Sequence, residues 1–319
     1  MKRVVVIGGG VLGAASAYYL AKAGHSVTLL EKGELCSGAS GANLGQISLL
    51  DRDEPWHARL AVDSLRVYDE LVKTADIEFE RTGGIAVLQD EEQLAAAREM
   101  AAQLAPAGVE VNFLFGEDMK KAEPHIDPKA ALAVAHCPDE GRINPLKTTL
   151  AFLDMARNCG ADVRQHAPVT GFVRENGRIV SVQTDAGEFP CDAVVNAAGA
   201  WAKSVGALLG LSIPVEYHRG TAFVSQPVAP VLRGPVVGGG FLLKSRLAHV
   251  KRRIGLAAVQ SHCGSVIIAQ ATEEAPLESR DITVQGFCLT ARRFLSIFPS
   301  LETLEIVRDR LRAAGVGLE

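Results

Sequence analysis

The chain contains no C-x-x-C pair, and its six cysteines lie far apart: Cys36, Cys137, Cys159, Cys191, Cys263 and Cys288. Zinc clusters and redox dithiols need closely spaced cysteines, so we expect no metal site and mostly reduced, structural thiols. A strong charge of either sign is also missing, because 33 Lys and Arg residues nearly balance 37 Asp and Glu residues. The formal net charge of −4 argues against a binder of duplex nucleic acid, whose phosphates are held chiefly by Lys and Arg.

The compositional bias of a disordered chain is absent as well. Hydrophobic residues make up 48% and charged residues 22%, and the sequence shows no internal repeat and no low-complexity tract. These proportions are typical of a globular protein with a buried core. At about 100–200 residues per domain, a length of 319 residues predicts about two domains.

The sequence contains no uninterrupted hydrophobic run that is long enough to span a membrane. The N-terminus comes nearest, because a basic start is followed by an apolar stretch without charge until Lys22, as in a signal peptide or a membrane span. Four glycines divide that stretch into the β-branched segment Val4–Ile7, a turn and an Ala-rich helix. We therefore predict a buried strand–turn–helix, no transmembrane segment and a cytoplasmic protein, with a peripheral position at the inner membrane face as the alternative.

Residues 8–13 form the pattern G-x-G-x-x-G between this strand and this helix. Gly8 permits a tight turn, Gly10 lets the backbone approach a pyrophosphate, and Gly13 lets the helix pack closely on the strand. The first N–H groups of a helix over residues 11–23 would face that phosphate. The alternative is a glycine-rich turn that binds nothing.

A second strand is predicted for Ser26–Leu30, and it ends at Glu31. A carboxylate at this place can accept hydrogen bonds from both ribose hydroxyls of an adenosine, and it would repel a 2′-phosphate. The dinucleotide could be NAD or FAD, and the fold does not decide between them. The small-residue loop over residues 36–46 favours FAD, because its backbone can follow a long ligand and offer many N–H donors.

The sequence VVVIGGGVLGAASAYYLAKAGHSVTLLEK, followed by SGASGANLGQIS, resembles the D-amino-acid oxidase group of flavoproteins. That group includes glycine oxidase, sarcosine oxidase and the β subunits of opine and proline dehydrogenases. The resemblance extends to about residue 308 and is specific for a flavin-binding fold rather than for a substrate. It implies an α/β protein with a Rossmann-like FAD-binding domain (1–76, 143–213 and 300–319). A smaller α+β substrate domain with a mostly antiparallel sheet (77–142 and 214–299) is interleaved with it.

Several further elements follow from local patterns. Residues 56–74 have near-helical apolar spacing, which predicts an amphipathic helix, and Asn176-Gly177 predicts a hairpin. In the substrate domain, Phe241–Leu243, Ile254–Val259 and Ser265–Ala269 are predicted to be strands of the sheet.

FAD is the cofactor that the resemblance implies. Val169 sits where the family places a residue whose backbone meets the adenine. The strand that begins near Cys191 ends against the flavin at Ala198-Gly199, where small residues allow a close approach. The predicted cofactor-binding residues are Gly8, Gly10, Val11, Leu12, Gly13, Glu31, Lys32, Ser37, Ser40, Asn43, Gly45, Gln46, Val169, Ala198, Gly199 and Trp201.

The implied activity is oxidation of the CH–NH bond of an amino acid or N-substituted amino acid, of the glycine, sarcosine, D-amino-acid, proline or opine type. A neutral amine would pass a hydride from its α-carbon to flavin N5, and water would hydrolyse the imine. This chemistry needs no side-chain nucleophile, and the sequence identifies no catalytic residue. Candidates on the substrate side are Tyr217, His218, Arg219, Arg246 and His249, since arginine offers a carboxylate a bidentate donor fork; the alternative for each is a solvated surface position.

Beyond Arg308 the sequence departs from the family's pattern, which continues with a tryptophan- and glycine-bearing segment and a last helix over the flavin. We therefore expect an FAD-binding domain that is incomplete at its C-terminal end and admits more water to the flavin. Two other functions stay open. One is an NAD-dependent dehydrogenase. The other is a flavin-binding subunit or inactive remnant that works in a hetero-oligomer with electron-transfer chains.

Overall fold

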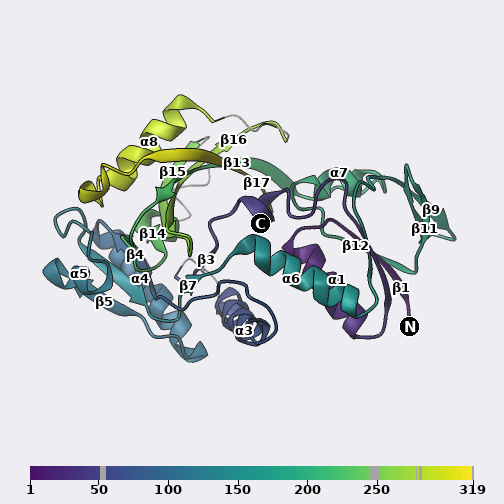
Figure 1. Cartoon of the computed structure of the whole chain (residues 1–319), viewed down its shortest axis with the longest axis horizontal. Coiled ribbons are helices and arrows are strands. Elements are labelled where there is room, and N and C mark those ends of the chain that lie inside the picture. Colours follow the sequence, from purple (N-terminus) through teal and green to yellow (C-terminus); the bar gives the residue numbers. More distant parts are fainter. Residues whose placement is uncertain (51–54, 244–251, 278, 280–281, 318–319) are drawn as a thin grey trace.

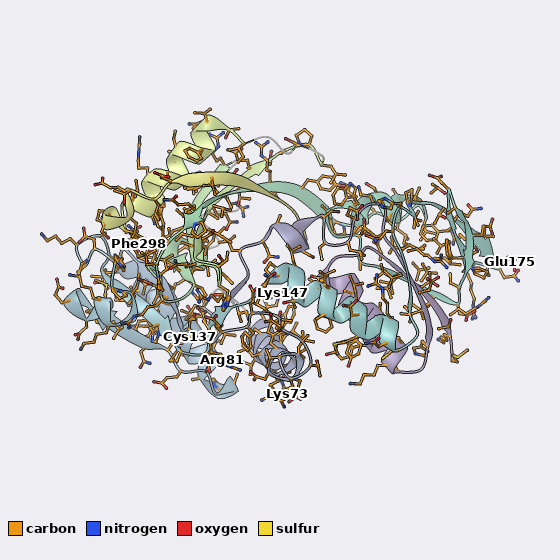
Figure 2. The ribbon with its side chains drawn as sticks, viewed as in Figure 1. Lys73, Arg81, Cys137, Lys147, Glu175 and Phe298 are labelled. Carbon is orange, nitrogen blue, oxygen red and sulfur yellow. The ribbon has the colours of Figure 1, made fainter. Side chains whose placement is uncertain are left out.

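The computed structural model of the chain describes residues 1–317 apart from 51–54, 244–251, 278 and 280–281. Two large sheets lie at opposite ends of an elongated molecule, and helices α1 and α6 lie between them (Figure 1). Figure 2 places Lys147 in this central region and Glu175 at the outer tip of a smaller sheet. The mixed α/β fold that the sequence predicts is therefore confirmed.

The first large sheet is parallel throughout, with the strand order β12-β1-β2-β8. Its strands are β1 (Arg3–Ile7), β2 (Ser26–Leu30), β8 (Asp162–Arg164) and β12 (Ala193–Asn196). Both faces of β1 are buried, since Val4 and Val6 pack into one apolar cluster and Val5 and Ile7 into another. Such continuous apolar strands are typical of parallel sheets covered on both faces.

Two helices cover one face of this sheet. Helix α1 (Val11–Lys22) presents Ala14 and Ala17 to Val6 and Leu29, and α6 (Pro145–Asn158) adds Phe152 to the same cluster. The small side chains of α1 let it lie close to the strands. The predicted strand–turn–helix at the N-terminus is confirmed, and in the described residues no helix is long and apolar enough to cross a membrane.

The second large sheet has eight strands in the order β17-β13-β16-β15-β14-β4-β6-β5. All neighbouring strands are antiparallel except β14 and β4, so the mostly antiparallel sheet is confirmed. Its strands are β4 (Gly84–Leu88), β5 (Asn112–Phe115), β6 (Ala133–Cys137), β13 (Val215–Pro227), β14 (Val236–Gly238), β15 (Arg252–Gln260), β16 (Ser265–Glu274) and β17 (Ile306–Gly317).

Helices pack on both faces of the eight-stranded sheet. On one face, α8 (Val284–Leu295) and the turn after it bring Phe294 and Phe298 against the strands. On the other face, α4 (Glu91–Leu104) packs with α3 (Pro55–Leu71) in a second apolar cluster. On the face of β13, β15 and β16 that carries Ala222, Ala257 and Ala269, the partly buried side chain of Leu44 packs against the apolar cluster.

The chain crosses between the two sheets beside a two-stranded pair, β3 (Gln46–Ile47) with β7 (Gly141–Arg142).

A three-stranded sheet extends the parallel end of the molecule and contains β9 (Val169–Glu175), β10 (Arg178–Thr184) and β11 (Gly187–Pro190). The predicted hairpin turn is confirmed, with positive φ at Asn176 and Gly177. The short helices are α2 (Ala39–Ala42), α5 (Met119–Ala122) and α7 (Ala202–Ala207), with 3-10 turns η1 (Ala105–Ala107), η2 (Gly116–Asp118), η3 (Gly199–Trp201), η4 (Gly239–Leu242) and η6 (Pro299–Leu301).

The predicted strand at Phe241–Leu243 is wrong. Two glycines follow β14, and the backbone turns into the 3-10 helix η4, in which Leu243 N donates to Gly240 O. Phe241 and Leu242 still pack against the core, so the apolar pattern predicted their burial but not their backbone conformation.

At the C-terminal end, the backbone of β17 pairs with β13 in the eight-stranded sheet, although the sequence assigned residues 300–319 to the FAD-binding domain. The domain boundaries themselves stay a prediction.

The six cysteines all lie in the described part of the chain, and all six are free. Cys36, Cys137 and Cys191 are buried, and burial raises the pKa of each of these thiols. Raised pKa values keep these thiols protonated and unreactive, in agreement with the structural role predicted for them.

Candidate cofactor and substrate site

A cavity of about 1370 Å³ lies between the parallel sheet and the eight-stranded sheet. One end lies at the carboxyl ends of β1 and β2, where ligands of doubly wound sheets bind. The other end lies under the eight-stranded sheet, at Val237 and Ala257. Its volume exceeds the roughly 300–1,000 Å³ of sites for drug-sized molecules, so it has room for a long ligand and a second small molecule.

The turn between β1 and α1 is built around glycines that nothing larger can replace. Gly8 has a φ of +114°, and a Cβ there would lie 2.4 Å from Ala197 O. A Cβ on Gly13 would lie 1.9 Å from Gly8 O, so α1 could not approach its turn. The helix consequently begins with its N–H groups close to the cavity, where its positive end favours an anion.

Glu31 closes this turn from the end of β2. Its Oε2 accepts a hydrogen bond from Gly9 N at 2.7 Å, and its Oε1 accepts one from Gly33 N at 2.8 Å. A carboxylate offers about four lone-pair positions, so two stay available to hydroxyl donors in the cavity. The same side chain therefore fixes the loop and faces the place where a ribose would lie.

The loop over residues 36–46 is held by its own side chains. Ser40 Oγ accepts from Val11 N at 2.9 Å, which caps α1. Asn43 donates to Ser40 O at 2.7 Å and accepts from Gly45 N at 2.8 Å. At the end of the loop, Gln46 Nε2 donates to Ala258 O at 2.7 Å, so the loop is tied to the eight-stranded sheet.

Lys32 and Trp201 face each other at the end of the cavity beside Glu31. The Lys32 ammonium lies 3.6 Å from the Trp201 ring centroid, a cation–π contact. The indole Nε1 is buried and finds no hydrogen-bond acceptor among the described residues. Buried polar groups are nearly always paired, so this N–H is a donor available to a ligand.

Fourteen of the predicted cofactor residues line this cavity, and only Gly13 and Gly45 of that set lie behind its wall. Leu12 is 71% exposed at the cavity, an apolar side chain that a bound ligand would cover. The sequence did not identify Ser204, Val205 and Leu208, which continue the wall from Trp201. Ser204, Val205 and Leu208 follow Trp201 by three, four and seven residues, a helical spacing that could have indicated them.

The substrate-side candidates are less well placed. Tyr217, His218 and Arg219 are not among the described residues that line the cavity, and Arg246 and His249 lie outside the described residues. Arg219 forms an ion pair with buried Glu273 at 2.7 Å and reaches the wall only through Ser279, whose Oγ accepts from it at 2.8 Å. Glu273 also pairs with Arg252.

His218 and Tyr217 have their own partners beside the cavity. His218 Nε2 lies 3.8 Å from Glu216 Oε2, and the Tyr217 hydroxyl lies 3.5 Å from Ser204 Oγ. The end of the cavity under the eight-stranded sheet is instead lined by residues that the sequence did not indicate, and these are Val237, Phe241, Ala257, Gln270, Leu277 and Ser279.

The family of FAD dependent oxidoreductases (DAO) matches the chain over residues 3–316. The chain belongs to this family. Its cofactor is therefore FAD rather than NAD, and the glycine turn, Glu31 and the unpaired Trp201 Nε1 fit an adenine dinucleotide.

Among relatives, 4-methylaminobutanoate oxidase (formaldehyde-forming) of Paenarthrobacter nicotinovorans is 32% identical over 219 residues, 67% of this chain and 26% of that protein. Hydrogen cyanide synthase subunit HcnC of Pseudomonas aeruginosa is 30% identical over 275 residues, 72% of this chain. The chain spans about a quarter of the first relative's length and 66% of the second's.

Solved structures show the same fold. L-proline dehydrogenase from P. horikoshii superposes with a TM-score of 0.87 at 26% identity, over 98% of this chain and 81% of that one. Glycine oxidase from Geobacillus kaustophilus superposes with a TM-score of 0.85 at 24% identity, over 99% of this chain and 84% of that one.

Proposed function

We propose that the protein oxidises the CH–NH bond of an amino acid or an N-substituted amino acid. The observation that carries this proposal is the continuity of the cavity, which runs from the glycine turn and Glu31 to the apolar residues Val237, Phe241 and Ala257 of the eight-stranded sheet. A dinucleotide held at the first end would present its redox ring to a small molecule at the second end. When bound, FAD supplies an acceptor for a hydride from the amine carbon.

The chain's own part is binding, orientation and exclusion of water. We propose that FAD is held by the predicted cofactor residues that line the cavity, with the pyrophosphate at the start of α1 and the ribose at Glu31. Gln46 lies against the carbonyls of Val236 and Ala258 and would position the loop over the ring. The parallel sheet would belong to the FAD-binding domain and most of the eight-stranded sheet to the substrate domain.

The names of the relatives support the substrate class. The oxidase of P. nicotinovorans is named for 4-methylaminobutanoate, human mitochondrial dimethylglycine dehydrogenase is 30% identical over 241 residues, and the P. horikoshii structure is an L-proline dehydrogenase. Each name specifies an amino acid whose nitrogen carries a further carbon substituent. We therefore expect an N-substituted amino acid to be a better substrate than the corresponding primary amine.

Anaerobic reduction of the purified, FAD-loaded protein tests this proposal. The visible absorption band of the flavin should bleach with at least one of sarcosine, dimethylglycine, 4-methylaminobutanoate, proline, glycine, D-alanine or an opine. Dithionite serves as the control, because it reduces any bound flavin chemically. Bleaching by dithionite and by none of the amines would reject the proposed activity while leaving FAD binding intact.

A second candidate is a flavin-binding subunit that turns over only with partner chains. The observation in its favour is that the relative HcnC is named as a subunit of hydrogen cyanide synthase. The same reduction experiment separates the two functions. A protein that acts alone is reduced by an amine and reoxidised by oxygen or an artificial acceptor, whereas a dependent subunit is reduced without catalytic turnover.

A further inference from the structure

A second cavity, of about 540 Å³, has no lining residue in common with the cofactor cavity in the described part of the chain. Part of its wall is apolar and is formed by Pro124, Val228, Pro230, Val231 and Leu232. This volume and this lining are typical of small-molecule sites, which combine apolar walls with a few convergent polar groups.

The polar groups in this cavity are mostly basic. His125, Arg142, Arg233 and His262 come from four separate segments of the chain, and none of the described lining residues is acidic. Basic side chains normally disperse over a protein surface, because like charges repel each other when they are brought together. Arg142 is paired with Glu80, but Arg233 forms no ion pair in the described part of the chain, so its position at this hollow favours a negatively charged ligand.

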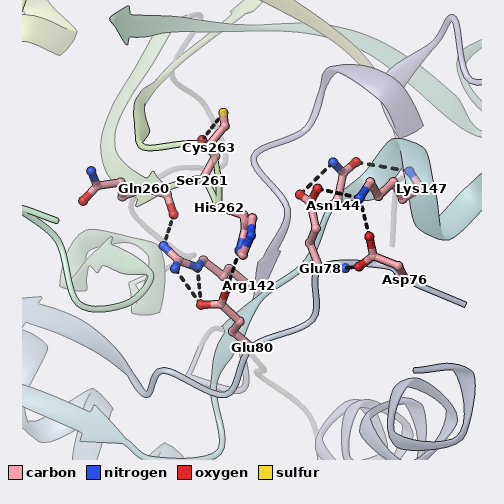
Figure 3. A network of polar contacts seen from close by, with 10 residues as sticks. All are labelled: Asp76, Glu78, Glu80, Arg142, Asn144, Lys147, Gln260, Ser261, His262 and Cys263. Atoms are coloured by element: carbon pink, nitrogen blue, oxygen red, sulfur yellow. Dashed lines mark hydrogen bonds and ion pairs between the residues drawn. The ribbon is translucent and has the colours of Figure 1, made fainter. Parts of the chain in front are cut away.

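Two of the four are oriented by Glu80, which stands behind the cavity wall. Arg142 Nη2 donates to Glu80 Oε2 at 2.6 Å, and His262 Nδ1 lies 2.7 Å from Glu80 Oε1 (Figure 3). The hydrogen bond that His262 donates to Glu80 raises the pKa of the imidazole, which favours the protonated ring with a second donor at Nε2. Three of the five N–H groups of Arg142 are engaged by Glu80 and Gln260 O, and two are left for a ligand.

Arg233 faces the cavity from the loop after β13. One of its guanidinium N–H groups donates to Lys121 O, and its backbone N donates to Glu123 Oε2 at 3.0 Å. Glu123 is buried, and burial raises its pKa to about 7, so its negative charge is weakened at neutral pH. The rest of the Arg233 guanidinium has no partner among the described residues.

The loop that carries Arg233 is fixed by buried Gln260. Gln260 Oε1 accepts from Val231 N at 2.7 Å and from Leu232 N at 3.1 Å, and its Nε2 donates to the carbonyls of Val228, Ala229 and Gly264. Five hydrogen bonds to one amide hold the cavity wall in place before any ligand arrives. A preformed site of this kind loses little conformational entropy on binding.

We propose that this cavity binds a small molecule with an oxyanion group, a phosphate or a carboxylate, attached to an apolar body. The oxyanion would take charge-assisted hydrogen bonds from Arg142 and Arg233, and protonated His262 would add to the positive field. The apolar body would lie against Pro230 and Val231. Because the two cavities have no described lining residue in common, this site is separate from the one proposed for the redox substrate.

Cys263 provides a local reporter, since it lines the cavity and is exposed. Hydrogen bonds from Ser261 and Ser265 lower the pKa of its thiol, which favours alkylation. Cys159 is exposed at the end of α6 and serves as an internal control in the same molecule. The rates of iodoacetamide alkylation at both cysteines would be measured by peptide mass spectrometry on the FAD-loaded protein.

The probes are phenyl phosphate, benzoate and the neutral benzyl alcohol, each titrated into the reaction. We expect at least one of the two anions to slow alkylation of Cys263 in a saturable manner, by about tenfold at a concentration ten times its Kd. Alkylation of Cys159 should not change. Protection by phenyl phosphate alone identifies a phosphate site, and protection by benzoate alone identifies a carboxylate site.

Arg233→Ala should raise the concentration needed for protection by about tenfold, because a charge-assisted pair is lost. Arg178→Ala removes an exposed arginine on β10 and should leave protection unchanged. The proposal fails if neither anion protects Cys263 or if benzyl alcohol protects it equally well. It also fails if the anion protects Cys263 at the same concentration in the Arg233→Ala variant as in the wild type.

Discussion

The Gln46 side chain donates a hydrogen bond to the backbone carbonyl of Ala258, 2.7 Å away, across the gap between the cofactor loop and the eight-stranded sheet. Gln46 also pairs through its backbone with Arg142 in the small β3–β7 sheet. One residue thus joins the loop over residues 36–46 to the eight-stranded sheet. The geometry of the loop depends on a contact that spans 212 positions in the sequence.

Gln46→Ala should weaken FAD binding, because the loop loses its anchor on β15. We expect the Kd for FAD to rise by about tenfold, the effect of one or two lost hydrogen bonds. Fluorescence titration of the apoprotein with FAD measures this constant. Gln183→Ala, on β10 away from the cavity, is the matched control, and an equal effect of both substitutions would contradict the anchoring role.

Gly13→Ala should destabilise the fold, because the added Cβ would lie 1.9 Å from Gly8 O. Overpacking at a rigid backbone contact costs about 3 kcal/mol or more, so the melting temperature should fall clearly. Gly240→Ala is the control, since a Cβ there meets nothing within 4 Å. Equal melting temperatures for the two variants would show that α1 does not pack on its turn as described.

Glu31→Gln keeps the shape of the side chain but replaces the carboxylate by a neutral amide. Both carboxylate oxygens accept hydrogen bonds, one from Gly9 N and one from Gly33 N. Hydrogen bonds to a charged group contribute about 1.5–3 kcal/mol, so FAD affinity should fall by about tenfold to a hundredfold. Glu34→Gln removes a nearby exposed carboxylate and should leave FAD affinity unchanged. Unaltered binding by Glu31→Gln would remove the ribose role proposed for this residue.

These local features were predictable because their residues are neighbours in the sequence. The turn at Gly8, the strand before it and Glu31 lie within one short βαβ stretch, and spacing alone places them together. The substrate end was not predictable in this way. Gln270 and Phe241 meet the cavity only through the pairing of distant strands, which single-sequence patterns do not specify.

The Arg219 prediction shows the same limit. An arginine at the start of a strand suggested a carboxylate ligand, but its partner Glu273 lies 54 positions away on the neighbouring strand. The register between β13 and β16 places Glu273 beside Arg219, and the ion pair between them balances the guanidinium charge within the protein. The 3-10 turn at Phe241 was missed because a three-residue apolar run has no measurable period.

Glu123 should make the stability of the protein depend on pH. Burial raises its pKa from 4.5 to about 7, so the folded state favours the protonated carboxyl. Its contribution to stability is complete below the ordinary pKa of about 4.5 and is lost as the pH rises through about 7. Glu123→Gln should remove this dependence and be more stable than the wild type at pH 8, by about 2 kcal/mol.

Urea unfolding at a series of pH values measures this effect. Glu117→Gln, at an exposed position in η2, is the control and should follow the wild-type pH dependence. A Glu123→Gln protein that loses stability with rising pH as steeply as the wild type would show that another group is responsible.

Fluorescence of Trp201 tests most directly whether the large cavity is the FAD site. The chain has two tryptophans, and Trp56→Phe leaves Trp201, in the cavity wall, as the reporter. Titration of this apoprotein with FAD should quench the emission in a saturable manner, with one FAD per chain. Retention of FAD without any change in Trp201 emission would contradict the assignment of the cofactor to this cavity.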